Sequence, residues 1–183
     1  MYKQIIKKII IEKQIAIPNY KLVHRDFLFG DKSNYILVGI RRAGKSYLLY
    51  QDIQTRLNKG EQSAQDILYI NFEDERLSSL KAEELGTILD SYMELYPGKQ
   101  PFVYLDEIQN IEGWEKFARR LADSQYRVMI TGSNAKMLGK EMYSTRGGRY
   151  ILKEIFPFSF AEYLTYHQVE LGENWEYNQQ IKS

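Results

Sequence analysis

Short apolar runs alternate with longer stretches of helical periodicity along most of this chain. The runs occupy residues 35–38, 67–72, 102–105 and 128–131, and residues 150–155 form a weaker fifth run. Nearly continuous apolar runs of this length are typical of strands that are covered on both faces in a parallel sheet. The alternation of strands with helices therefore predicts an α/β fold with right-handed crossovers.

Amphipathic helices are predicted between these runs from apolar residues that recur every three or four positions. One helix follows residue 46 and ends near Gly60, a residue type favoured just beyond a helix C-terminus. Another ends before Pro97, and further helices are expected around residues 114–121 and 135–143. Ser159 and Glu162 form a capping box, which predicts a last helix through residue 166.

The first residues also predict a helix, with Tyr2, Ile5, Ile6 and Ile9 on one face. The longest apolar run of this segment, residues 9–11, is followed at once by two charged residues. Neither a signal peptide nor a membrane-spanning segment is therefore predicted. We expect this helix to pack on a core, and binding to a membrane surface is the alternative.

The composition bounds the size of the domain and excludes some kinds of site. The chain has 183 residues and 44% hydrophobic content, enough for one substantial domain. Lys and Arg number 25 against 24 Asp and Glu, so the net charge of +1 gives no electrostatic case for a nucleic-acid or membrane partner. The sequence has no cysteine, which excludes disulfides and thiolate chemistry and is compatible with a reducing compartment. We expect a cytoplasmic protein.

Residues 39–46 read G-I-R-R-A-G-K-S, a complete Walker A phosphate-binding loop between a predicted strand and a predicted helix. Backbone N–H groups and the helix dipole attract phosphate oxygens at such a turn. Lys45 is expected to reach the β- and γ-phosphates, and Ser46 to offer its hydroxyl to Mg²⁺. Arg41 and Arg42 also lie inside the loop, and the alternative to contact with the nucleotide is that their side chains face solvent. The residues expected at the nucleotide are Gly39, Arg41, Arg42, Ala43, Gly44, Lys45, Ser46 and Tyr47.

Two acids, Asp106 and Glu107, directly follow the third apolar run. Asp106 suits a Walker B role, in which its carboxylate helps to hold the Mg²⁺ that Ser46 also contacts. Glu107 is expected to polarise a water molecule for attack on the γ-phosphate. Acids often end strands, but behind a complete Walker A loop the catalytic interpretation is favoured.

Polar residues at two other strand ends are further candidates. We expect one of Thr131, Ser133 and Asn134 to contact the γ-phosphate or the attacking water, and simple turn formation is the alternative. A further hypothesis is that Asn71, near the end of the second run, hydrogen-bonds Glu107 and holds it inactive until a partner binds.

Two arginines, Arg146 and Arg149, flank a pair of glycines ahead of the fifth run. Either arginine is a candidate to neutralise charge on the γ-phosphate, in cis or across a subunit interface. An ordinary exposed arginine beside a glycine turn is an equally weighted alternative.

Together, these segments resemble a prokaryotic family of AAA-superfamily ATPases, in which a P-loop domain precedes a C-terminal domain of uncharacterised function. The resemblance spans residues 20–166. Its specificity comes from the segments N-F-E-D at 71–74 and P-F-S-F at 157–160. The segments that carry the resemblance are residues 39–46, Y-I-N-F-E-D at 69–74, L-D-E-I-Q at 105–109, T-G-S at 131–133, and G-R-Y at 148–150 leading to F-P-F-S-F at 156–160.

The resemblance implies a three-layer P-loop fold of the ASCE type, with sheet order 5-1-4-3-2, ATP as the nucleotide and Mg²⁺ as cofactor. Lys45, Ser46, Asp106 and Glu107 match the family pattern well, and Ser133 and Arg149 match it less closely. The chain then divides into an N-terminal helix at 1–19, a P-loop ATPase domain at 20–166, and a polar tail or truncated linker at 167–183. Because the family's C-terminal half does not follow, we expect ATP binding with poor turnover, since groups from that half could complete the site.

Three functions remain open from the sequence. The leading prediction is Mg²⁺-dependent ATP hydrolysis coupled to an unidentified protein partner or to self-association. A nucleotide-gated binding module with negligible hydrolysis and a P-loop kinase are the alternatives, and the adjacent acids at 106–107 favour water over a kinase acceptor. Nucleic acid is suggested by family analogy alone.

Overall fold

The computed structural model describes residues 2–30, 32–133 and 148–166 of the chain. Its centre is a five-stranded parallel sheet in the order β2-β3-β4-β1-β5, which confirms the predicted order 5-1-4-3-2. Each strand lies within one residue or so of its apolar run. The strands are β1 Asn34–Val38, β2 Ile67–Asn71, β3 Phe102–Asp106, β4 Arg127–Gly132 and β5 Tyr150–Glu154.

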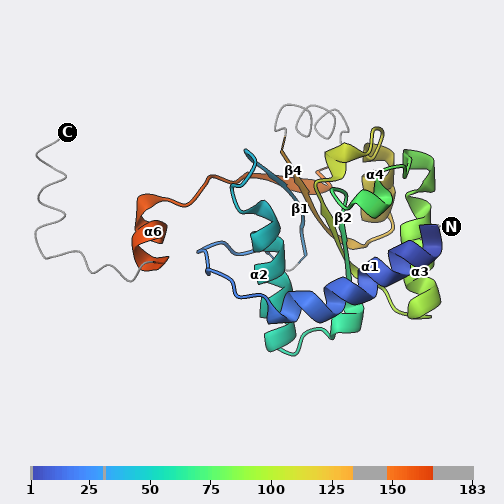
Figure 1. Cartoon of the computed structure of the whole chain (residues 1–183), viewed down its shortest axis with the longest axis horizontal. Helices are drawn as coiled ribbons and strands as arrows, with labels where there is room; N and C mark the ends of the chain where they lie inside the picture. Colours follow the sequence, from blue (N-terminus) through green and yellow to red (C-terminus); the bar gives the residue numbers. More distant parts are fainter. Residues whose placement is uncertain (1, 31, 134–147, 167–183) are drawn as a thin grey trace, which may run out of the picture.

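Helices cover both faces of the sheet and give the predicted three layers (Figure 1). Alternate strand residues point to opposite faces, so each strand feeds two separate cores. Leu37 and Tyr69 pack towards α2 on one face, whereas Ile36 and Leu105 pack with α3 and α4 on the other. The helices are α1 Tyr2–Ala16, α2 Lys45–Asn58, α3 Gly86–Leu95, α4 Glu115–Asp123 and α6 Phe160–Tyr166.

Short 3-10 helices complete several connections. They lie at Ile17–Asn19, Ala64–Asp66, Glu75–Leu77, Ala82–Glu84 and Ile108–Asn110. The last of these directly follows β3 and will matter for the site. The helix predicted near residues 135–143 lies outside the described residues.

The N-terminal helix α1 packs on the core, as its periodicity predicts. Ile6, Ile9 and Ile10 are fully buried against residues of β2 and α3. Gln14 is also buried, and its amide donates to the backbone oxygen of Ile67 over 2.8 Å. The apolar face of α1 is therefore used inside the fold. None of the described helices combines the length and apolar character needed to cross a membrane.

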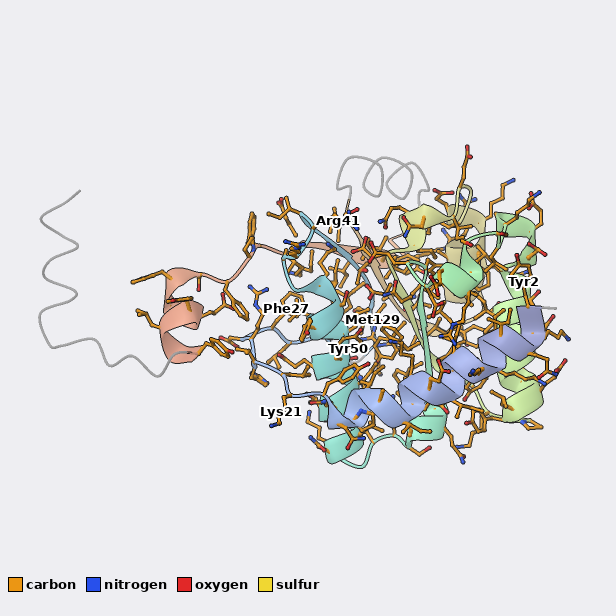
Figure 2. All side chains as sticks on the ribbon, viewed as in Figure 1. Tyr2, Lys21, Phe27, Arg41, Tyr50 and Met129 are labelled. Atoms are coloured by element: carbon orange, nitrogen blue, oxygen red, sulfur yellow. The ribbon has the colours of Figure 1, made fainter. Side chains whose placement is uncertain are left out.

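A segment without helix or strand joins α1 to β1 and runs alongside α2. Figure 2 shows Lys21 and Phe27 on this segment, which we call the strap (residues 20–30). Phe27 and Phe29 pack against the core on the α2 face. Backbone N and O of Arg25 bond to the side chain of Gln51, over 2.8 and 2.9 Å. These bonds fix the strap across the helix that follows the phosphate loop.

The last helix, α6, lies beyond α2 and apart from the sheet (Figure 1). The predicted capping box is present: the Ser159 backbone N donates to the Glu162 carboxylate, and the Glu162 backbone N donates to the Ser159 hydroxyl. α6 nevertheless contacts the strap through one ion pair, described below.

Candidate active site

The phosphate loop connects the carboxyl end of β1 to the first turn of α2. Two loop residues, Arg42 and Gly44, have positive φ angles of 64° and 89°. Gly39 is required for a different reason: a Cβ there would lie 2.2 Å from the backbone oxygen of Ile155, just after β5. α2 begins at Lys45, so its free N–H groups point into the loop.

Lys45 is buried inside this loop, with 3% of its surface exposed. Its Nζ donates to the backbone oxygens of Gly39 (3.2 Å) and Ile40 (3.1 Å). The same Nζ lies 3.4 Å from Oε1 of Glu107. A buried ammonium needs such partners, and phosphate oxygens entering the loop would compete for the same charge.

Asp106, at the end of β3, is fully buried and receives several hydrogen bonds. The hydroxyl groups of Thr131 and Tyr69 donate to its two carboxylate oxygens, and the Ser46 side chain also bonds to it. Burial raises the pKa of Asp106; these three hydrogen bonds oppose the rise, and the neighbouring charge of Glu107 adds to it. The fold thus brings Ser46 and Asp106 together as predicted, so that a hydroxyl group and a carboxylate lie side by side.

These oxygen groups fit a hard divalent cation. Mg²⁺ is usually held by one or two protein oxygens together with substrate phosphates and water, so a larger acidic cluster is not required. Within the part of the chain that the structure describes, no group of three His, Cys, Asp or Glu side chains could by itself hold a metal ion.

Glu107 has a left-handed backbone conformation, with φ 53°. Its backbone N donates to Thr131 Oγ1 over 2.9 Å, which ties the end of β3 to β4. Its Oε2 accepts a 2.6 Å hydrogen bond from the amide of Gln109. The same amide donates to Ser133 Oγ over 3.1 Å, so two predicted site residues share one partner.

The predicted contact between Asn71 and Glu107 is wrong for this structure. The Asn71 side-chain oxygen accepts from the backbone N of Glu73, two residues on, over 2.8 Å. Gln109 instead supplies the side-chain amide that reaches Glu107. Sequence reasoning treated Gln109 only as part of a family segment, although its place two residues after Glu107 was a usable signal.

The structure does not bring Arg149 to the phosphate loop. Tyr150, the next residue, pairs with Asn34 at the amino end of β1, whereas the loop leaves the carboxyl end of that strand. Arg149 is bonded to Asp123 over 2.5 Å. An interaction in cis with the γ-phosphate is thereby contradicted, and an interaction across a subunit interface stays a prediction. Arg146 and Asn134 lie outside the described residues.

The two sensor candidates that the structure describes, Thr131 and Ser133, differ in their surroundings. Thr131 is fully buried and supports both Asp106 and the backbone of Glu107. Ser133 is less buried and faces Gln109. Ser133 is therefore the more accessible of these two candidates.

Comparison with known proteins identifies this arrangement. A sequence model of an AAA domain family matches residues 31–164. The chain belongs to this family. An uncharacterized protein of Methanocaldococcus jannaschii is 36% identical over 166 residues, 90% of this chain and 36% of that protein. An uncharacterized protein of Haemophilus influenzae is 37% identical over 133 residues, 70% of this chain and 32% of that protein. The chain thus spans about one third of the length of these relatives.

A solved structure shares the fold of this AAA domain. AMPPCP-bound DnaA from Aquifex aeolicus superimposes with a TM-score of 0.51 at 16% sequence identity, covering 91% of this chain and 52% of that chain. Together with the family match and the sheet order, this likeness confirms an AAA-superfamily P-loop ATPase fold.

A cavity of about 460 Å³ opens beside the phosphate loop of the AAA domain. Its walls come from three separate segments: the loop and α2, the strap, and the region of α6. Arg42 and Tyr47 belong to the first, Lys21 to the second, and Phe158 and Tyr166 to the third. Arg41 does not line it; this exposed side chain pairs with Glu73 over 2.9 Å. Arg42 and Tyr47 thus face the cavity as well as solvent.

Arg25 joins all three walls of the cavity. One guanidinium nitrogen donates to the backbone oxygen of Ala43 in the loop over 3.0 Å. Another pairs with the Glu162 carboxylate of α6 over 2.7 Å, and the guanidinium lies 5.3 Å from the ring centroid of Phe158. Hydrogen bonds from Arg25, followed by those from Ser159, hold the pKa of Glu162 below its ordinary value. Sequence reasoning missed Arg25, because no motif marks the strap.

Proposed function

We propose that this AAA domain binds ATP with Mg²⁺ and hydrolyses the bond to its terminal phosphate. One observation carries the proposal: the buried Lys45 Nζ lies within the phosphate loop and 3.4 Å from Glu107. A phosphate-binding cation and a carboxylate base thus share one small volume. Ser46 and Asp106, which bond to each other, border the same volume.

Binding uses groups that are already oriented. The N–H groups of the loop and of the first turn of α2 would hold phosphate oxygens. Lys45 would exchange the backbone oxygens of Gly39 and Ile40 for the β- and γ-phosphates. The cavity beside the loop is large enough for a nucleoside, and Tyr47 and Phe158 offer aromatic surface to the base.

Ser46 and Asp106 would hold the Mg²⁺ that accompanies the nucleotide. Mg²⁺ neutralises charge on the phosphates and favours cleavage when it is bound. The buried position of Asp106 raises its pKa, and a cation nearby would favour its charged form.

Glu107 would accept a proton from the attacking water. Its backbone is fixed by Thr131, and its carboxylate lies between Lys45 and Gln109. This carboxylate supports water as the acceptor rather than the small-molecule acceptor of a kinase. We further propose that hydrolysis drives a conformational change on an unidentified protein partner or between copies of the chain.

The test is phosphate release from ATP and Mg²⁺ under single-turnover conditions, with protein in excess. We expect Glu107→Gln to bind ATP normally and to slow cleavage by about 10²- to 10⁴-fold, because the amide cannot accept the proton. Glu112→Gln is the matched control, since Glu112 is exposed on the connection that follows β3, and it should cleave at the native rate.

Each contrary result has a distinct meaning. Equal rates for the native chain and Glu107→Gln would contradict catalysis by Glu107. Tight binding with no cleavage by either protein would identify a nucleotide-gated binding module. Transfer of phosphate to an added small molecule faster than its release to water would identify a kinase.

A further inference from the structure

The side chain of Gln109 bridges two strand ends at the candidate site. Gln109 lies on the 3-10 turn Ile108–Asn110, directly after Glu107. Its Nε2 donates to Glu107 Oε2 over 2.6 Å and to Ser133 Oγ over 3.1 Å. One amide therefore joins a carboxylate that follows β3 to a hydroxyl that follows β4.

The other end of the same amide has no partner. Gln109 Oε1 is buried and accepts no hydrogen bond from any residue that the structure describes. Leaving a buried acceptor unpaired costs about 1–3 kcal/mol, so such an atom in a native fold calls for an explanation. Amide oxygen and nitrogen are about 2.3 Å apart, which puts Gln109 Oε1 within about 5 Å of Glu107 Oε2, the oxygen that Nε2 contacts. A water molecule at the site would supply the missing donor.

Nucleotide binding can free one oxygen of the Glu107 carboxylate from its contact with Lys45. Oε1 faces Lys45 Nζ over 3.4 Å, and Oε2 accepts from Gln109. Phosphate oxygens that attract Lys45 would weaken the first contact and leave the second in place. Oε1 would then be free to accept a proton while Gln109 keeps the carboxylate oriented.

We propose that Gln109 orients Glu107 through Nε2 and holds the attacking water through Oε1. The proposal rests on the ATP hydrolysis proposed above. One hydrogen of the water bonds to Gln109 Oε1, and the other passes as a proton to Glu107 Oε1. The water oxygen forms the new bond to the γ-phosphorus, and the β–γ bridging oxygen leaves with the electron pair of the broken bond. Glu107 then returns the proton to phosphate or solvent.

The experiment compares four proteins for ATP affinity and single-turnover cleavage: the native chain, Gln109→Met, Glu107→Gln and the double variant. Gln109→Met keeps the side-chain length and removes both polar ends. We expect it to slow cleavage at least about tenfold, part of the 10²- to 10⁴-fold that a positioned base contributes, with ATP affinity changed less than about twofold. In the Glu107→Gln background the same substitution should slow cleavage by a smaller factor than in the native chain, because the orienting part of its role needs the Glu107 carboxylate.

Controls separate this role from a structural one. Gln100→Met makes the same exchange at an exposed site before β3, at the opposite end of that strand, and should cleave at the native rate. Gln109→Glu keeps the side-chain shape, replaces the Nε2 donor by a carboxylate oxygen and adds a negative charge beside Glu107. It should also slow cleavage, and it replaces Gln109→Met if that variant unfolds.

The possible results distinguish a failure of the role of Gln109 from a failure of the proposed ATP hydrolysis. Native cleavage by both Gln109 variants, or losses that multiply in the double variant, would overturn the role of Gln109 alone. Equal cleavage by the native chain and Glu107→Gln would overturn Glu107 as the base and the role of Gln109 with it, whereas no cleavage by either protein would overturn the proposed hydrolysis itself. Weakened ATP binding with unchanged maximal cleavage would also overturn the role of Gln109, since it would put Gln109 in binding.

Discussion

At the scale of single residues, Gly39 shows how the sheet constrains the phosphate loop. β5 lies beside β1, and the chain just beyond it bonds back to the end of β1, from the Ile155 backbone N to the Val38 backbone oxygen over 2.7 Å. The Ile155 backbone oxygen consequently occupies the space where a side chain at position 39 would begin. The first glycine of the loop is therefore required by packing as well as by access for phosphate.

We predict that Gly39→Ala destabilises the fold by about 1–3 kcal/mol, the usual cost of overpacking. The Cβ would overlap backbone atoms, which cannot rotate away as a side chain can. Urea unfolding of the two proteins measures the effect.

Gly86→Ala is the matched control for this substitution. Its Cβ would meet only the end of the Arg120 side chain, at 3.2 Å, and alanine favours a helix over glycine by about 1 kcal/mol. The free energy of unfolding of Gly86→Ala should equal or exceed that of the native chain. A Gly39→Ala protein within about 0.5 kcal/mol of the native chain would show that the loop can shift without loss.

The sequence alone identified some of these residues and missed others for a physical reason. Lys45 and Asp106 belong to motifs whose spacing reflects local geometry. In the structure Lys45 lies beside Glu107, and Asp106 bonds to Ser46. Arg25 contacts Ala43 and Glu162, so its position depends on three segments that meet only after folding. The contact predicted for Asn71 was wrong because Lys45 and Gln109 take the two oxygens of the Glu107 carboxylate.

At the scale of elements, apolar runs predicted the strands well because a strand buried on both faces needs apolar residues at every position. The sheet order did not follow from these runs; it came from the family resemblance and was then confirmed. The strap could not be predicted, since its contacts are backbone bonds to Gln51 and two scattered aromatic residues, without any period.

The docking of α1 on α3 gives a prediction about acid. Hydrogen bonds from Lys3 and then Lys7 lower the pKa of Glu94 from 4.5 to about 2. A carboxyl group with a lowered folded-state pKa contributes stability above its unfolded pKa, and the contribution is lost as pH falls through the folded value. The effect of Glu94 should therefore disappear between about pH 4.5 and 2. Because the pair is exposed, salt should weaken it.

Unfolding of Glu94→Gln at a series of pH values measures this contribution. The variant should be less stable than the native chain near neutral pH, and the two should converge as the pH falls to about 2. Glu83→Gln is the control, because Glu83 is an exposed acid just before α3, and it should follow the native curve. A difference that stays constant over this pH range would mean that the ion pairs do not anchor α1.

At the scale of the whole molecule, the cavity beside the loop depends on parts that are distant in the chain. The strap, the phosphate loop and the region of α6 each supply one wall, and Arg25 of the strap bonds to the other two. α6 itself lies apart from the sheet (Figure 1), and its Glu162 pairs with Arg25 of the strap over 2.7 Å. A ligand in the cavity would touch every wall at once and would favour the assembled state over the unfolded one.

We therefore expect nucleotide to stabilise the entire fold. A ligand that binds only the folded state at 100 times its dissociation constant adds about 2.7 kcal/mol, or about 5–10 °C in melting temperature for a chain of this size. Thermal unfolding with ADP or ATP and Mg²⁺ measures the shift. Lys45→Ala should abolish most of it, because the phosphates lose their buried cation. Lys153→Ala, an exposed lysine on β5, should shift as the native chain does. The same shift in Lys45→Ala would mean that the nucleotide binds outside the phosphate loop, and the cavity would then need another ligand.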